Sequence, residues 1–266
     1  MTGAKRSSSI RRTARTARTA RIASSTDSAD AGGTAVPAVP EDAAVATPPA
    51  IPTPRSTYRH GDLRRALLDA GIELARDGGP DAVVLREATR RAGVVPNAAY
   101  RHFASRQDLL QAVRAAALAA LAQAIEAELA ALDESAPPAD FARASLRAVG
   151  TGYMQFALAE PGLFRTAFSV PDELEGVPVP DKAGDSGLNP YQLLGAALDR
   201  MMEAGVLSTA RRPGAEYLAW SAVHGLSMLV IDGPLRMVAM SPGQAHQIGQ
   251  RLLDMVEKGL QAADER

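Results

Sequence analysis

The chain has 266 residues, 46% of them hydrophobic and only 4% aromatic, with 29 basic and 30 acidic side chains and a net charge of -1. This length and composition are typical of a folded chain of one or two domains, and the complete absence of cysteine excludes disulfides, thiolate metal sites and cysteine nucleophiles. No apolar run approaches the length of a membrane span, and the first 22 residues lack the apolar core of a secretion signal. The sequence therefore predicts no membrane partner and a cytoplasmic location.

Residues 1–57 are rich in Ala, Ser, Thr and Pro and contain an Arg-Thr-Ala repeat over residues 12–20. Their first 22 residues hold seven basic and no acidic side chains. Such a composition buries too little apolar surface to offset the entropy cost of ordering, which predicts a disordered tail. The tail either adds non-specific affinity for DNA, is an inert extension, or results from a gene start assigned too far upstream.

A first helix is expected to begin near Asp62, as its N-cap, and to end at Gly78-Gly79. A second helix is expected over residues 85–92, and it runs into Gly93. Because glycine adopts a positive φ without a Cβ clash, Gly93 suits the tight turn of a helix-turn-helix.

Pro96 opens a third, short helix over residues 96–102, where its missing N–H is not needed and its φ is already helical. Helical spacing predicts that Ala99 and Phe103 pack inward. The residues expected to project outward are Asn97, Ala98, Arg101 and His102.

Three segments carry a family resemblance: RHGDLRRALLDAGIELARDGG, LREATRRAGVVPNAAYRHF and SRQDLLQAV. Over roughly residues 58–114 they resemble the three-helix DNA-binding domain of tetracycline-repressor-type (TetR/AcrR) transcriptional regulators. Four residues depart from the usual pattern: Val84 and Val95 stand where Ser or Thr is common, Thr89 where a small Ala is usual, and Ala88 where a larger aliphatic is usual. A missing N-cap costs about 1 kcal/mol.

The charge distribution fits a DNA partner at this end of the chain. Residues 55–114 carry eleven basic and seven acidic side chains, whereas residues 115–266 carry eleven and nineteen. Arginine contacts to phosphate supply most non-specific DNA affinity. Within the third helix, Asn97 is suited to pair with adenine and Ala98 to touch a thymine methyl group. The resemblance implies phosphate contacts for Tyr100, His102 and Arg106, and the further phosphate candidates are Arg59, His60 and Arg101.

The rest of the chain is also predicted to be helical. A long Ala/Leu-rich helix begins at Arg106, capped by Ser105, and continues to about residue 133. Further helices are expected over about 140–159, from Pro161, over 191–205, over about 213–232 and over about 242–262. Residues 171–190 are acidic, rich in Gly and Pro and without periodicity, so they predict a mobile surface loop.

The segment GYMQFALAEPGLFRTAF and the later WSAVHG at residues 220–225 resemble the regulatory domain of a TetR subgroup named for its Trp…His-Gly (WHG) signature. The resemblance spans roughly residues 140–235 and implies a ligand-responsive core and a homodimer formed by the last two helices. Independently, the helix over 213–232 is apolar nearly all round, as expected for a helix buried on two sides.

Aromatic and thioether side chains in this half of the chain are candidates for a ligand pocket, because small-molecule sites are mostly apolar with a few polar groups. The candidates are Tyr153, Phe156, Phe164, Phe168, Met201, Trp220 and His224. The same set also describes an ordinary helical core, in which His224 is a hydrogen-bonded structural histidine.

Catalysis, metal binding and cofactor binding have no support in the sequence. The four histidines are far apart along the chain, and no metalloprotease, nucleophile-elbow, phosphate-loop or dinucleotide motif occurs. We therefore expect neither an enzyme nor a protein that carries a metal or cofactor.

Together these features predict an all-α protein with a tail (1–57), a helix-turn-helix DNA-binding domain (58–105) and a helical ligand-binding and dimerisation domain (106–266). The expected function is sequence-specific regulation of transcription, as a homodimeric repressor that binds double-stranded DNA at a palindromic operator and responds to a small apolar effector. The alternative is an architectural DNA-binding protein with little sequence preference.

Overall fold

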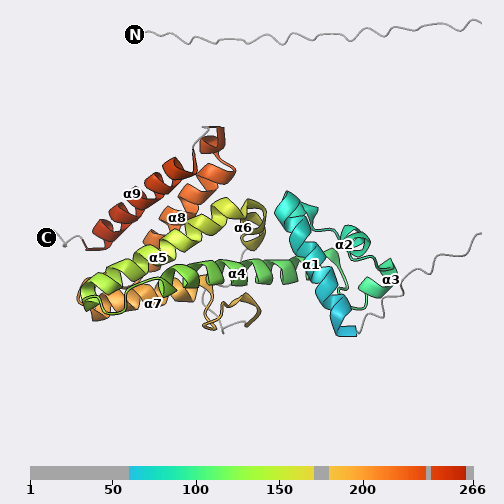
Figure 1. The fold of residues 1–266 in the computed structure, drawn as a ribbon, viewed down its shortest axis with the longest axis horizontal. Helices are drawn as coiled ribbons and strands as arrows, with labels where there is room; N and C mark the ends of the chain where they lie inside the picture. The colour runs from blue at the N-terminus through green and yellow to red at the C-terminus, as the bar shows by residue number, and fades with distance from the viewer. Residues whose placement is uncertain (1–59, 171–179, 238–240, 262–266) are drawn as a thin grey trace, which may run out of the picture. The chain divides into compact units, whose positions relative to one another are not determined.

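The structure, a computed structural model, describes residues 60–170, 180–237 and 241–261, and these belong to one compact unit that begins at Arg55. Every regular element within these ranges is a helix (Figure 1), which confirms the all-α prediction. The tail predicted for residues 1–57 lies outside the described residues.

The first three helices, together called the reading head, are α1 (His60–Gly78), α2 (Leu85–Arg91) and α3 (Pro96–Ala99), with a short 3-10 turn η1 (Pro80–Ala82) after α1. Helix α1 begins two residues earlier than predicted, so Asp62 lies within its first turn and is not the N-cap. Its apolar face, Leu67, Ala70 and Leu74, is buried against the rest of the protein.

The turn of the helix-turn-helix forms as predicted, since Gly93 has a φ of 67°. Helix α3 is shorter than the predicted range of 96–102, because the regular helix ends at Ala99. The N–H groups of His102 and Phe103 then both donate to the Ala99 carbonyl at 2.9 Å, which turns the chain inward. Ala99 and Phe103 are buried as predicted, at 0% and 2% exposure.

The departures from the family pattern have local consequences in the reading head. Val84 and Val95 occupy the N-cap positions of α2 and α3 and supply no side-chain cap. Thr89 is buried, and its hydroxyl donates to the Arg86 carbonyl at 2.6 Å. A buried hydroxyl satisfied within its own helix costs little, so Thr89 is accommodated where a smaller residue is usual.

Helix α4 (Arg106–Ala130) is the central helix and contacts α1, α5, α6 and α7. It begins as predicted, with the Ser105 hydroxyl accepting a hydrogen bond from the Asp108 N–H at 3.1 Å. By length and composition alone α4 could cross a membrane, with a mean hydropathy of 1.3 over its 18-residue window. Half of that window is buried, and its apolar face, including Leu109, Val113 and Leu121, belongs to the core.

The remaining helices are α5 (Pro138–Ala159), α6 (Pro161–Ala167), α7 (Pro190–Glu203), α8 (Ala215–Ile231) and α9 (Pro242–Gln261), with short 3-10 turns η2 (Pro180–Lys182) and η3 (Pro234–Met237). Their bounds agree with the predicted ones to within a few residues. The predicted mobile loop over 171–190 is described only from residue 180. That part is bound to α4 by hydrogen bonds. The Glu126 carboxylate on α4 accepts hydrogen bonds from the N–H groups of Asp185 and Ser186, at 2.8 and 3.0 Å.

Helix α6 packs unusually closely against the end of α1. A Cβ atom placed on Gly162 would lie 2.2 Å from the Ala75 carbonyl oxygen and 2.4 Å from that of Arg76. The Arg76 guanidinium also donates from Nε to the Glu160 carboxylate, at 3.0 Å to its nearer oxygen. The absence of a side chain at residue 162 therefore sets the distance between α6 and the reading head.

We predict that Gly162→Ala lowers the free energy of unfolding by about 3 kcal/mol, because the new methyl group meets backbone that cannot move aside. The matched control is Gly195→Ala on α7, where a Cβ would lie 3.8 Å from Glu216 Oε1, an ordinary contact. The control should be neutral or stabilising, by about 0.5–1 kcal/mol, since alanine favours a helix over glycine. Denaturant unfolding checks both, and equal stability of the two variants would contradict the steric argument.

Candidate functional site

The first candidate site is the outer surface of α3 and the turn that follows it. Asn97 and Arg101 are exposed, Tyr100 is 59% exposed, and Ala98 and His102 are half-buried. The buried Ala99 and Phe103 hold this surface against α1 and α2. Five of the predicted DNA-binding residues thus lie on α3 and the turn after it, each at least partly exposed.

One basic residue near this surface was not among the sequence candidates. The Arg64 guanidinium lies over the ring of Phe103, 5.3 Å from its centroid, and the residue is exposed. A guanidinium over an aromatic face is favourable, and it adds positive charge beside α3, the second helix of the helix-turn-helix, called here the recognition helix. The sequence gives little indication of this contact, because Arg64 and Phe103 are 39 positions apart.

Arg106 has a different environment from the one expected of a residue that only contacts phosphate. Its Nε and one terminal nitrogen donate to the carbonyl oxygens of Val83 and Pro80, at 2.8 and 2.7 Å. It therefore fastens the start of α4 to the segment between α1 and α2. Arg59 lies outside the described residues, as does the side chain of His60.

The second candidate site is a cavity of about 860 Å³ among α4–α9, called here the cavity. Its apolar wall comes from several helices and includes Leu118, Leu146, Val149, Leu194, Val223, Leu253 and Val256. Its aromatic lining is Tyr153, Phe168, Tyr191, Tyr217 and Trp220, joined by the imidazole of His224. A cavity of this size and character fits a small apolar molecule.

Four of the seven predicted pocket residues line the cavity, namely Tyr153, Phe168, Trp220 and His224. Phe156, Phe164 and Met201 do not. They are core residues at 7%, 0% and 0% exposure, and the Phe164 ring packs behind the wall, 5.0 Å from Phe168 and 5.6 Å from His224. Helical spacing alone does not say which apolar face meets a cavity and which meets another helix.

Several lining residues were missed by sequence reasoning, among them Arg114, Arg147, Lys182, Tyr191 and Glu257. Arg114 is only 3% exposed and donates to the Gln111 side chain and to the Val170 carbonyl, at 2.6 and 2.9 Å. A basic residue on a helix is usually a solvated one, so nothing in the sequence marks Arg114 as a wall residue.

Three side chains, called here the polar set, are linked by hydrogen bonds at the cavity wall. The Tyr153 hydroxyl lies 2.7 Å from His224 Nδ1, and Trp220 Nε1 donates to the same hydroxyl at 3.1 Å. Burial raises the pKa of the Tyr153 phenol and lowers that of the His224 imidazole. Both groups are therefore uncharged at neutral pH.

Comparison with known proteins assigns the family. Residues 67–113 match the model of bacterial regulatory proteins of the tetR family, and residues 146–256 match the tetracyclin-repressor-like C-terminal domain. The chain belongs to the TetR family. It is accordingly a DNA-binding transcriptional regulator with the helix-turn-helix expected from the sequence. The C-terminal match names no subgroup, so membership of the Trp…His-Gly subgroup stays a prediction.

Solved structures share the fold of this TetR-family regulator. One is a protein of unknown function from Rhodococcus sp. RHA1, with 24% identity and a TM-score of 0.56, covering 78% of this chain and 100% of that one. Another is TetR from Acinetobacter baumannii AYE, with 17% identity and a TM-score of 0.51, covering 76% of this chain and 96% of that one. None of the curated proteins matches the regulator.

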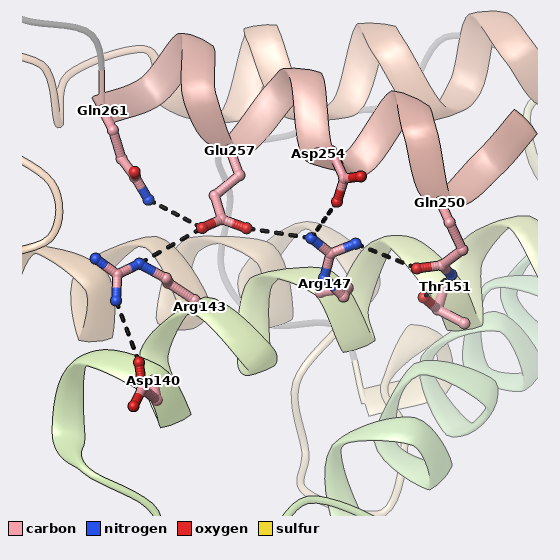
Figure 2. Close-up of polar contacts among 8 residues, drawn as sticks. All are labelled: Asp140, Arg143, Arg147, Thr151, Gln250, Asp254, Glu257 and Gln261. Carbon is pink, nitrogen blue, oxygen red and sulfur yellow. Dashed lines mark hydrogen bonds and ion pairs between the residues drawn. The ribbon is translucent and has the colours of Figure 1, made fainter. Parts of the chain in front are cut away.

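A row of polar contacts, called here the α5–α9 ladder, joins α5 to α9 in the regulator (Figure 2). Arg147, which lines the cavity, donates to the carboxylates of Asp254 and Glu257 at 2.5 and 3.3 Å, and to the Gln250 side chain at 3.2 Å. The other members are Asp140, Arg143, Thr151 and Gln261. Through Arg147 and Glu257 the ladder and the cavity share residues.

The fluorescence of Trp220 should report the protonation of His224. Trp220 is the only tryptophan in the chain, and its ring centroid lies 5.9 Å from that of His224. Because imidazolium quenches indole emission at short range, acidification should reduce emission, with a midpoint below 6.5 since burial lowers the pKa of His224.

The control for this titration is His224→Phe, which keeps Glu257, the carboxylate that lines the same cavity. The variant should lose the quenching step. The assignment fails if the step persists in the variant or if its midpoint in the wild type lies at or above 6.5.

Proposed function

We propose that this protein is a cytoplasmic, non-catalytic repressor that binds a palindromic operator as a homodimer and releases it when a small molecule occupies the cavity. Residues 58–105 would bind DNA, and residues 106–266 would bind the effector and form the dimer. The observation that carries the proposal is that one compact unit holds both an exposed recognition helix and a cavity of about 860 Å³.

The exposed surface of α3 and the turn after it supports two roles in DNA binding, base contact and phosphate contact. Asn97 at the start of α3 is suited to read an adenine and Ala98 a thymine methyl group, because the N-terminal half of a recognition helix meets the base edges. Tyr100, Arg101 and His102 follow the helix and are suited to contact phosphates. Arg59, His60 and Arg106 remain further phosphate candidates. Phosphate contacts position the protein, and base contacts carry the choice of sequence.

The outer faces of α8 and α9 support a homodimer. Large apolar side chains are exposed there in the single chain: Leu218 at 46%, Leu229 at 45%, Ile248 at 39% and Met255 at 70%. Between the two leucines on α8 lies Gly225, and a Cβ atom placed there would meet nothing within 4 Å. An apolar face with a glycine at its centre suits close approach by a second copy, which can set two recognition helices about 34–36 Å apart.

The contacts of α6 support coupling between ligand binding in the cavity and the position of the reading head. Its C-terminal end supplies Ala167 and, just beyond it, Phe168 to the cavity wall, and Gly162 near its other end touches the carbonyl groups at the end of α1. A ligand that binds more tightly when α6 is displaced would lower the affinity of the protein for its operator. By linkage, the operator would lower the affinity for the ligand by the same factor. Typical couplings of this kind are about 1–3 kcal/mol.

The DNA-binding proposal is tested by gel-shift titration against the upstream region of the protein's own gene. The wild type should prefer this region to random DNA at equal salt, and Asn97→Ala should reduce the affinity by about 5- to 150-fold, as expected for a lost base contact. The matched control, Gln155→Ala, removes an exposed amide on α5 and should bind like the wild type. Equal affinity for both DNAs would end the proposal.

Deletion of residues 1–55 separates the repressor from the architectural alternative. The shortened repressor should keep its preference for the upstream region, because the recognition helix is intact. An architectural protein that relies on its basic tail should lose most of its affinity, so that result would replace the proposed function.

The dimer proposal predicts that Leu218→Glu with Leu229→Glu yields a monomer, because two buried carboxylates in an apolar interface are unfavourable. Light scattering after size-exclusion chromatography measures the mass directly. Val84→Glu is the control, since Val84 is 41% exposed but lies in the reading head. A monomeric wild type would contradict the homodimer. A double variant that stays dimeric would show that the interface lies elsewhere.

A further inference from the structure

Val95 immediately precedes the recognition helix, and its apolar side chain is 68% exposed, more than any other large apolar side chain described in the reading head. Its backbone is extended, with φ -73° and ψ 141°, and its side chain makes no capping hydrogen bond. A single exposed apolar residue is common on protein surfaces and by itself indicates nothing. The position of Val95 gives its exposure a meaning, because the N-terminal residues of a recognition helix meet the base edges of DNA.

The turn before the recognition helix directs Val94 and Val95 to opposite sides. Val94 packs against the core, and its N–H donates to the Thr89 carbonyl at 3.0 Å. In extended backbone, successive side chains project in opposite directions. Since Val94 projects inward, Val95 projects away from the body of the reading head, which agrees with its high exposure. Val95 thus lies on the outside of the reading head, two residues before the exposed Asn97.

The chemistry of a valine side chain limits the groups of DNA that it can contact favourably. Valine has no donor or acceptor in its side chain, so Val95 can hydrogen-bond neither to a phosphate oxygen nor to the polar edge of a base. In the major groove, the apolar group that a base pair presents is the C5-methyl group of thymine. Contact between this methyl group and those of Val95 would remove apolar surface of both partners from water. Thymine is therefore the base that fits Val95.

We propose that Val95 is a specificity-determining residue that contacts the methyl group of one thymine in each half of the palindromic operator. This inference rests on the proposed function and deepens it, because it names a base that each half-site carries. The contact is separate from the thymine contact proposed for Ala98. Together with an adenine read by Asn97, it predicts A·T pairs in the part of the half-site that faces the start of α3.

The test uses the upstream fragment that the wild type prefers, with single thymines replaced by deoxyuridine, which lacks only the C5-methyl group. Gel-shift titration of the full-length protein at constant salt measures the affinity for each fragment. At the thymine that Val95 contacts, the replacement in one half-site should weaken binding about three- to fivefold, as expected for the loss of one buried methyl group. Replacement in both half-sites should weaken it about 10- to 25-fold. The proposal is overturned if no thymine shows such an effect, and this scan needs no variant protein.

The variant Val95→Ser assigns the effect to its residue. At the thymine that Val95 contacts, the preference for thymine over deoxyuridine should fall below about 1.5-fold in the variant, because the apolar partner of the methyl group is gone. A thymine contacted by Ala98 should keep its effect in the same variant. If every sensitive thymine stays equally sensitive, other residues make the contacts and the assignment to Val95 is wrong.

The matched control is Val84→Ser. Val84 is the N-cap residue of α2, supplies no side-chain cap, as Val95 supplies none, and is 41% exposed. Serine is a preferred N-cap residue, so both variants should fold at least as stably as the wild type. Val84→Ser should keep every thymine preference of the wild type. If it loses the same preference as Val95→Ser, helix capping rather than base contact is the cause, and the proposal falls.

Failure of this inference is distinguishable from failure of the proposed function. A wild type that prefers its upstream region to random DNA, but responds to the loss of no thymine methyl group, is a sequence-specific regulator without this contact. A wild type that prefers no fragment to random DNA contradicts the operator itself, and the inference then fails with the proposed function.

Discussion

The close contact between α6 and the end of α1 is the constraint on which the relation of the two sites depends. Only glycine fits at residue 162, because a Cβ atom would lie 2.2 Å from the Ala75 carbonyl oxygen. Seven residues of helix span only about 10 Å, so the other end of α6 is never far from the reading head. That other end supplies Ala167 and Phe168 to the cavity. One short helix therefore contacts both the cavity and the end of α1 in the reading head.

The chemistry of the cavity follows from burial. An imidazole and a phenol removed from water favour their neutral forms, and neutral groups are free to act as donors and acceptors in a directional way. In the structure the two groups are joined to each other by a hydrogen bond, and Trp220 donates to the Tyr153 hydroxyl. Where such groups face a ligand, a ligand that cannot pair with them leaves them unsatisfied, which lowers its affinity.

Much of the fold could be predicted from the sequence because its signals are local. Gly93 and Pro96 set the turn and the start of α3, and Ser105 caps α4, each through its own backbone geometry. The cavity was only partly predictable, since its wall is assembled by tertiary contacts. Apolar periodicity finds Phe164 as readily as Phe168, although one lies behind the wall and the other forms it. The role of Arg106 depends on carbonyl groups more than twenty residues away, which no motif records.

Two of the connections between the cavity and the rest of the molecule, the α5–α9 ladder and the contact at Gly162, differ in stiffness. The α5–α9 ladder leads to the proposed dimer face, but its ion pair between Arg147 and Asp254 leaves 35% and 51% of the two side chains exposed. Water and salt screen such pairs, and the side chains can exchange partners within the ladder at little cost. The contact at Gly162 is steric, and packed backbone yields only by moving as a body. We therefore expect a displacement of Phe168 to reach α1 with less loss than a displacement of Arg147 would reach α9 through the ladder.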